Sequence, residues 1–344
     1  MRIIQRIVTL IAALLIVPAV SAAQSTWSVT DTWHLGGEGQ WDYVTVDPAT
    51  HRVFLPRILH TQIIDALTGK VIGDIPGQKT AHGVAIAPAV NRGFITDGGE
   101  GTIIIFDLTT YQVLGKLAAA LDADGIIYDQ TLNRVFVASG DANALLTFQA
   151  DIDPKAGKID PPIPLGGAPE FLASDGSGKV YVNLQDKDVV AEVDTKTRSV
   201  IARWPVAPAG APVGLSIDAP HHHLFIGCRK PQKLVVMSTD DGKIIASLPI
   251  GAGVDATAFD SGQAFASCRD GSLIVVAEKG GTFFVEQIVK TAYGARTMGL
   301  DPSNHRIYLP TATFEDPQLV TPPARPKSKP GTFMVIQVER SAAK

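Results

Sequence analysis

Short apolar segments and turns alternate along the chain at a nearly constant interval. Each unit contains an apolar run, a turn that usually begins with Asp, a second run that carries an aromatic residue, and a third apolar run. The turn residues lie 40–46 positions apart and are Asp47, Ala87, Asp129, Asp175, Asp218, Asp260 and Asp301. The apolar stripes over three turns that an amphipathic helix needs are missing. This period, with about four strands in each unit, predicts a β-propeller.

The first and last segments of the predicted domain are expected to form one complete unit of this pattern together. The last unit has three evident strands and ends at Met334–Val338, whereas Trp27–Leu35 has the pattern of a strand outside the other units. A strand edge without a partner favours pairing with such a segment. We therefore predict an all-β fold, a seven-bladed β-propeller of four-stranded blades whose last blade is closed by the N-terminal strand.

The first 23 residues have the pattern of a secretory signal peptide. Arg2 and Arg6 precede the mainly apolar run Ile7–Val20, and Ser21-Ala22-Ala23 offers small residues for cleavage. The apolar run is shorter than the roughly 20 residues that a membrane span requires. We predict a signal peptide at residues 1–23, a single propeller domain at residues 24–344, no membrane span in the mature chain, and a periplasmic or secreted monomer.

Composition and cysteine content narrow the possible functions. With 34 acidic and 30 basic residues the net charge is −4, and 45% of the chain is hydrophobic, which excludes a disordered chain and makes nucleic acid an unlikely partner. The chain has no Cys-x-x-Cys-His segment, so a covalently attached haem is excluded. Cys228 and Cys268 occupy equivalent positions in neighbouring units, and whether they are bridged stays open.

Ionisable residues recur where each inner strand is expected to begin, about five residues before the turn. Six of the seven positions are ionisable, namely Asp42, His82, Asp124, Glu170, Asp255 and Arg296, and the seventh is Val213. In a propeller these strand starts meet at one mouth of the central channel. The carboxylates of Asp42, Asp124, Glu170 and Asp255 are candidate ligands of a divalent cation, which would relieve their mutual repulsion. The alternative is a hydrated channel whose charge is partly neutralised by His82 and Arg296.

Arginines are expected around the same mouth. The loops between second and third strands return to this face and carry Arg57, Arg229 and Arg269. Guanidinium groups bind carboxylates and phosphates through paired hydrogen bonds. The predicted ligand-binding residues are therefore Arg57, His82, Arg229, Arg269 and Arg296, with His82 and Arg296 as candidate catalytic residues. The long loop Glu315–Gly331, rich in Pro and basic residues, is a further candidate functional segment.

Several segments resemble a known family. They are Phe94-Ile95-Thr96-Asp97, Asp65-Ala66-Leu67-Thr68-Gly69-Lys70 and Asp194-Thr195-Lys196-Thr197. They are similar to the exported bacterial β-propellers built from forty-residue YVTN repeats, the YncE-like group. The sequence departs from that repeat at Pro56-Arg57, Gly227-Cys228 and Ser267-Cys268, where Thr-Asn is expected. The resemblance implies the propeller fold and leaves the function open, because such propellers have many roles.

Two classes of function remain. The first is an exported propeller that binds a small anionic ligand, or an exported protein partner, at the polar channel mouth. The second is a divalent-metal-dependent propeller enzyme, catalysing lactone hydrolysis or a lyase-type elimination with the mouth carboxylates and His82.

Overall fold

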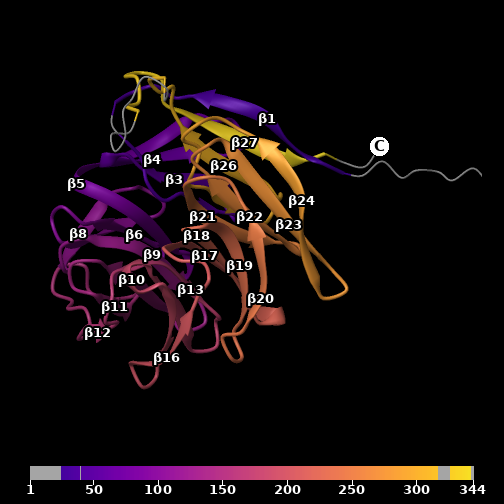
Figure 1. Ribbon diagram of the computed structural model, residues 1–344. Helices are drawn as coiled ribbons and strands as arrows, with labels where there is room; N and C mark the ends of the chain where they lie inside the picture. The colour runs from indigo at the N-terminus through magenta and orange to yellow at the C-terminus, as the bar shows by residue number, and fades with distance from the viewer. Residues whose placement is uncertain (1–24, 39, 317–325, 342–344) are drawn as a thin grey trace, which may run out of the picture.

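The computed structural model describes residues 25–38, 40–316 and 326–341, so the predicted signal peptide lies outside the described residues. Figure 1 shows sheets that follow one another round the molecule in chain order, from indigo through magenta and orange back to yellow. The described ranges contain strands and three short 3-10 helices, η1 (Pro88–Val90), η2 (Gln185–Lys187) and η3 (Ala219–His221). No helix within them is long and apolar enough to cross a membrane.

Four of the sheets are antiparallel and contain four strands in chain order. They are β9 (Ala123–Asp129), β10 (Arg134–Ser139), β11 (Ala144–Gln149) and β12 (Ile163–Pro164); β13 (Pro169–Ser174), β14 (Lys179–Leu184), β15 (Val189–Asp194) and β16 (Ser199–Pro205); β17 (Pro212–Asp218), β18 (His223–Arg229), β19 (Gln232–Ser238) and β20 (Ile244–Pro249); and β21 (Val254–Asp260), β22 (Gln263–Cys268), β23 (Ser272–Lys279) and β24 (Thr282–Lys290).

A fifth four-stranded sheet joins the two ends of the chain. Its strands, in order across the sheet, are β1 (Trp27–His34), β27 (Met334–Arg340), β26 (Arg306–Thr311) and β25 (Gly299–Asp301). β1 pairs antiparallel with β27 from Trp27 opposite Arg340 to His34 opposite Met334. The expectation that the N-terminal strand supplies the fourth strand of the last sheet is thus confirmed, and indigo β1 lies beside yellow β27 in Figure 1.

The remaining sheet has seven strands because one long strand takes part in two sets of pairings. The sheet runs β2 (Thr45–Asp47), β3 (Arg52–Pro56), β4 (Ile58–Asp65), β5 (Val71–Ala87), β6 (Arg92–Asp97), β7 (Thr102–Asp107) and β8 (Val113–Ala118). Residues 71–76 of β5 pair with β4, whereas residues 84–87 pair with β6. Gly77 separates the two parts with a φ of 89°, a conformation that favours glycine.

The first strands of the successive units surround a central cavity. Its volume is about 400 Å³, and its walls include residues of β2, β5, β9, β13, β17, β21 and β25. Most of these side chains are apolar, as in Val46, Ile126 and Leu215. Tyr43 and Phe171 lie at one end with their ring centroids 4.5 Å apart. These two rings also line the polar cavity described next, so they separate the apolar channel from its polar mouth.

Candidate functional site

The strand starts at one end of the channel form a polar cavity of about 190 Å³, here called the polar mouth. All six ionisable residues expected at the strand starts line this cavity together with Arg229, namely Asp42, His82, Asp124, Glu170, Asp255 and Arg296. Each lies at or just before the beginning of a first strand, except that His82 lies within the shared strand β5. The turns that end these strands fix the positions, because each of the six residues lies five residues before its turn, which brings all of them to the same end of the channel.

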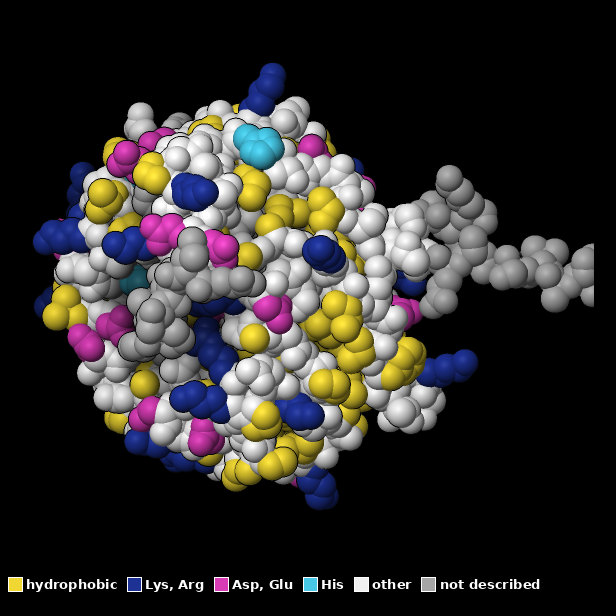
Figure 2. Space-filling model, turned by 45° about the horizontal axis from the view of Figure 1, so that its top comes forward, with side chains coloured by type: hydrophobic (Ala, Val, Ile, Leu, Met, Phe, Trp, Pro, Cys, Tyr) yellow, Lys and Arg dark blue, Asp and Glu magenta, His cyan; other side chains and the backbone are white. Residues whose placement is uncertain are grey.

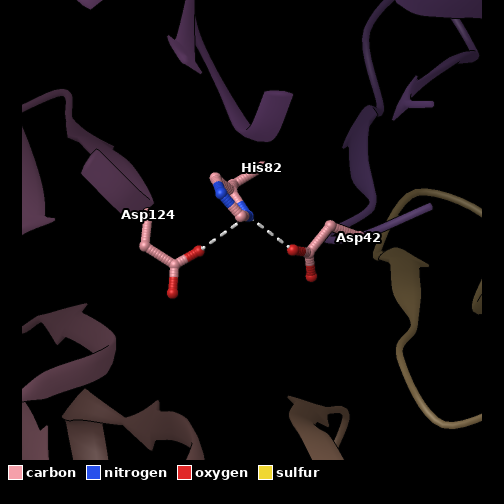
Figure 3. A group of neighbouring side chains, drawn as sticks. All are labelled: Asp42, His82 and Asp124. Atoms are coloured by element: carbon pink, nitrogen blue, oxygen red, sulfur yellow. Dashed lines mark hydrogen bonds and ion pairs between the residues drawn. The ribbon is translucent and has the colours of Figure 1, made fainter. Parts of the chain in front are cut away.

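Asp42, His82 and Asp124 form a chain of contacts across the polar mouth (Figure 3). His82 Nδ1 lies 2.7 Å from Asp42 Oδ2 and 3.4 Å from Asp124 Oδ1. The hydroxyl of Tyr43 donates to the other Asp124 oxygen at 3.3 Å. One donor atom from each of the three residues lies within 4.8 Å of the others. Two carboxylates and an imidazole at these distances can share a proton or hold a cation.

Burial and mutual charge shift the pKa values of this cluster. Burial raises the pKa of Asp42, against the hydrogen bond from His82. Burial and the neighbouring charge of Asp42 raise the pKa of Asp124 well above its ordinary value. For His82, burial lowers the pKa, but the hydrogen bond to Asp42 and the charge of Asp124 outweigh it and raise the pKa to about 9. The cluster therefore favours a positive charge between its two carboxylates, either a proton on His82 or a bound cation.

On the other side of the polar mouth, two arginines neutralise Asp255. Arg229 donates from Nη2 to Asp255 Oδ1 and from Nε to the carbonyl of Val254. Arg296 Nε lies 3.4 Å from the second Asp255 oxygen. Because both carboxylate oxygens of Asp255 face guanidinium groups, the structure does not support Asp255 as a metal ligand. The group with metal-binding geometry in the described chain is Asp42, His82 and Asp124, without Asp255 or Glu170.

Glu170 lies in the polar mouth without a hydrogen-bond partner among the described residues. Burial raises its pKa, Arg229 opposes this, and the charges of Asp255 and Asp42 add to it, so that the pKa is about 7 rather than 4.5. A carboxyl group with a pKa near neutrality is suited to proton transfer.

We expect Glu170→Gln to stabilise the protein at alkaline pH only. Because the folded-state pKa of Glu170 is above its ordinary value, its stability contribution is complete below about pH 4.5 and is lost as the pH rises through 7. Glutamine has no such loss. The free energy of unfolding of the variant, measured with chelator present, should equal that of the wild type at pH 4.5 and exceed it by about 1–3 kcal/mol at pH 8.

Glu100 provides the control for this measurement. The hydrogen bond from Lys116 lowers the pKa of Glu100, which is the opposite direction. Glu100→Gln should therefore gain no stability as the pH rises. If Glu170→Gln follows the pH profile of the wild type, the carboxyl group is solvated and its position in the polar mouth is wrong.

Arg57, predicted to bind ligand at the rim, is instead buried, with 1% of its surface exposed. Its guanidinium donates to the backbone carbonyls of Glu38 and Gln40 and to Gln62 Oε1, at 2.8, 3.3 and 2.9 Å. It also lies 3.6 Å from the ring centroid of Phe333. Burial lowers its pKa to about 10. The ligand-binding prediction for Arg57 is therefore corrected, because its side chain is buried and its donors are bonded to Glu38, Gln40 and Gln62.

Arg269 lies beside a second cavity, which adjoins the polar mouth at Arg296. This cavity has a volume of about 480 Å³ and is here called the rim pocket; its walls are Gln40, Trp41, Arg269, Gly294, Arg296, Phe314, Pro326, Lys327 and Ser328. On the face of the molecule that Figure 2 shows, basic side chains lie within a hollow. The aromatic walls do not follow from the repeat, because Trp41 and Phe314 lie outside the periodic positions.

The two cysteines are free and buried in β18 and β22. Burial raises the pKa of each thiol to about 12. The open question of a bridge is thereby answered in favour of two separate thiols, and neither has the low pKa of a reactive cysteine.

Comparison with known proteins identifies the fold. No protein-family profile matches the chain, and no curated protein sequence matches it. Among solved structures, it is similar to the hydrazine synthase of Kuenenia stuttgartiensis, with a TM-score of 0.68 and 14% identity over 82% of this chain and 93% of that chain. It is also similar to the WD40 repeats of RRP9, with a TM-score of 0.75 and 10% identity over 92% of this chain and all of that chain. The chain therefore has a β-propeller fold like that of WD40 repeats.

Proposed function

We propose that the protein is an exported β-propeller that binds a small anionic ligand at its polar mouth through a divalent cation. The observation that carries this proposal is the convergence of Asp42, His82 and Asp124, whose donor atoms lie within 4.8 Å of one another. An ion bonded at about 2.0–2.2 Å needs donors roughly 3–4.4 Å apart, so small side-chain movements would accommodate it. Two carboxylate oxygens and one imidazole nitrogen suit Mn²⁺ or Zn²⁺.

Such an ion would face the arginines of the polar mouth. Arg229 and Arg296 line the same cavity as the three candidate ligands, which leaves the ion's remaining positions open toward the cavity. A ligand carboxylate could then bind the ion with one oxygen and receive a hydrogen bond from Arg296 on the other. The anionic ligand predicted from the sequence is thereby compatible with a mouth that contains four carboxylates.

The number of blades, the single domain and the export of the protein are also part of this proposal. We infer seven blades within one domain at residues 24–344, because β5 serves as the last strand of one four-stranded unit and the first strand of the next. Counted in this way, the seven-stranded sheet supplies two blades and the other five sheets supply one each. The YVTN-like segments and the signal-like N-terminus support an exported protein of that repeat group, in the periplasm or the medium.

Metal titration of the mature chain tests the proposed function. We expect calorimetry on chelator-treated protein to show one Mn²⁺ or Zn²⁺ per chain. His82→Ala and Asp124→Asn should each weaken binding by at least the roughly 10–100-fold that loss of an outer-shell partner costs. His60 provides the matched control. It pairs with Asp74 at 2.6 Å and does not line the polar mouth, so His60→Ala should bind the ion as the wild type does.

Two results would overturn the metal site. The first is the absence of a stoichiometric ion, which would mean that a proton on His82 balances the two carboxylates. The second is unchanged affinity in both mouth variants.

A divalent-metal enzyme is the second candidate, and Glu170 is the observation that favours it. Its pKa of about 7 suits a general base within the polar mouth. This function requires the metal-loaded protein to hydrolyse a lactone or catalyse an elimination. Stoichiometric metal without turnover of such substrates would favour the binding function.

A further inference from the structure

Two of the candidate metal ligands lie where the pairing of their strands is irregular. The register between β5 and β6 shifts over residues 81–84, which places His82 inside the irregularity. The register between β9 and β10 shifts over residues 123–126, which places Asp124 inside it. Bulges of this kind redirect side chains and interrupt the hydrogen bonds of the ladder. Here the side chains of His82 and Asp124 point toward each other, with Nδ1 and Oδ1 3.4 Å apart (Figure 3).

The hydroxyl of Thr96, on β6, bonds to the backbone at both irregularities. It accepts from the amide of Gly83, the residue directly after His82, at 2.8 Å. It donates to the carbonyl of Asp124 at 2.7 Å. The side chain of Thr96 is completely buried, so water has little access to the hydroxyl. One hydroxyl group therefore joins the backbones of two candidate ligands that belong to neighbouring units of the repeat.

The same position in two other units carries a polar side chain with a similar bond. This position lies two residues after the aromatic residue of the second strand. Ser267 donates to the carbonyl of Arg296, and Asn183 donates to the carbonyl of Val213 at 2.9 Å. Like Asp124, both acceptors occupy the strand start of the following unit. Neither bond joins two of the candidate metal ligands, as the hydroxyl on β6 does.

We propose that Thr96 is a positioning residue of the metal site, which holds His82 and Asp124 at the separation that a divalent cation needs. The inference deepens the proposed function and rests on it, because both concern the same ion. Ligands that are fixed before binding lose less conformational freedom when the ion binds. Without the hydroxyl, the amide of Gly83 and the carbonyl of Asp124 would each lose this partner, and the two strand starts would be less firmly joined. The threonine of the YVTN-like segment 94–97 thereby has a role in binding as well as in the fold.

The test is calorimetric titration of the chain from residue 24 onward with Mn²⁺ alone. Thr96→Val keeps the size of the side chain and removes the hydroxyl. We expect it to weaken Mn²⁺ binding by about 10–100-fold, the range for loss of an outer-shell partner. Thr96→Ser retains the hydroxyl, so its affinity should stay within about threefold of the wild type, in line with the contribution expected from the hydrogen bonds rather than from the methyl group.

Ser267 provides the matched control, because it occupies the equivalent position in its unit. Its hydroxyl donates to the carbonyl of Arg296 and lies 3.5 Å from the carbonyl of Ala256, the residue after Asp255. Ser267→Ala therefore removes the same kind of bond between units without touching a candidate metal ligand. Like Thr96→Val, it should lower the midpoint of chemical denaturation. Its Mn²⁺ affinity should change by less than about twofold, which a merely structural role of Thr96 would not explain.

Hydrogen exchange of the Gly83 amide in chelator-treated protein checks the bond itself without metal. Exchange should be at least tenfold faster in Thr96→Val, in line with loss of a hydrogen bond to a buried amide, and an unchanged rate would overturn the inference.

Failure of this inference is distinguishable from failure of the metal site. Wild-type Mn²⁺ affinity in Thr96→Val, together with lost affinity in His82→Ala, would overturn the role of Thr96 and leave the metal site standing. Equal weakening in Thr96→Val and Ser267→Ala would also overturn it, because the effect would then be a general loss of contact between units. A wild-type chain that binds no stoichiometric Mn²⁺ would overturn the proposed function and this inference together.

Discussion

Replacing Trp27 with alanine should lower the free energy of unfolding by about 3–5 kcal/mol. Trp27 belongs to β1 and is 4% exposed, with its ring meeting Phe265 edge-on at a centroid distance of 4.9 Å. Its indole Nε1 donates to Gln263 Oε1 at 3.0 Å. Both residues belong to β22 of the neighbouring sheet. The substitution would therefore open a cavity between two sheets and leave a buried acceptor without its donor.

Trp27 is also fixed through its backbone. Its amide donates to Gln287 Oε1 at 2.9 Å, and its carbonyl accepts from Gln287 Nε2 at 2.7 Å. β1 is thus bonded to β27 along its length and to β24 at this residue. The N-terminal strand therefore belongs to the last sheet and also bonds to the neighbouring sheet at Trp27. This double role explains the large effect expected from replacing one residue near the chain terminus.

Chemical denaturation of the chain from residue 24 onward would measure the loss. Val29, which lies on the same strand and is 41% exposed, provides the control, and Val29→Ala should cost less than about 1 kcal/mol. Deletion of residues 24–36 should destabilise the whole domain further, because β27 would keep β26 as a partner but lose β1 along its other edge. A Trp27→Ala variant within about 1 kcal/mol of the wild type would show that β1 does not hold these sheets together.

The periodic part of the fold could be predicted because it is encoded locally. Most first strands end at the predicted turn residues, as β2 does at Asp47, β9 at Asp129 and β25 at Asp301. The ionisable residues precede these turns by five residues, which is why Asp42 and Arg296 could be assigned to one channel end. Periodicity alone did not show that β5 joins two units into one sheet, because a repeat pattern does not reveal that one strand continues from the end of one unit into the next.

The contacts made by each candidate side chain could not be predicted in the same way. Asp255 occupies the same position in its unit as Asp124, yet it pairs with two arginines while Asp124 faces an imidazole. The choice depends on side chains from other blades. The rim pocket was not predicted for a related reason: Trp41, Phe314 and Lys327 meet only where the two ends of the chain come together.

Arg57 shows the same limit for a residue at a repeated position. In the repeat it lies one position before the place of Arg229, which does line the polar mouth. At Arg57, however, the chain before β2 supplies carbonyls from Glu38 and Gln40, and Phe333 covers the guanidinium. The segments that bury Arg57 exist only at the junction of the two chain ends. A repeat-based prediction therefore placed it at the rim with the other arginines.

Arg57→Ala should consequently reduce stability by about 3–5 kcal/mol and leave the proposed metal site intact. The substitution would remove three hydrogen bonds from a charged donor, to the carbonyls of Glu38 and Gln40 and to the side-chain oxygen of Gln62. Bonds of this kind contribute about 1.5–3 kcal/mol each, and the exposure of Glu38 and Gln40 lets water replace part of that contribution. Arg57→Lys should recover only part of the loss, because one ammonium group cannot reproduce the planar fork or its packing on Phe333.

Denaturation and metal titration on the same samples separate the structural role of Arg57 from a role in binding. Lys70 is an exposed basic residue on the turn after β4, and Lys70→Ala should change the free energy of unfolding by less than about 0.5 kcal/mol. Folded Arg57→Ala protein should bind Mn²⁺ as the wild type does, because none of the hydrogen bonds of Arg57 reaches a residue that lines the polar mouth. A variant of normal stability that fails to bind Mn²⁺ would restore Arg57 to the binding residues.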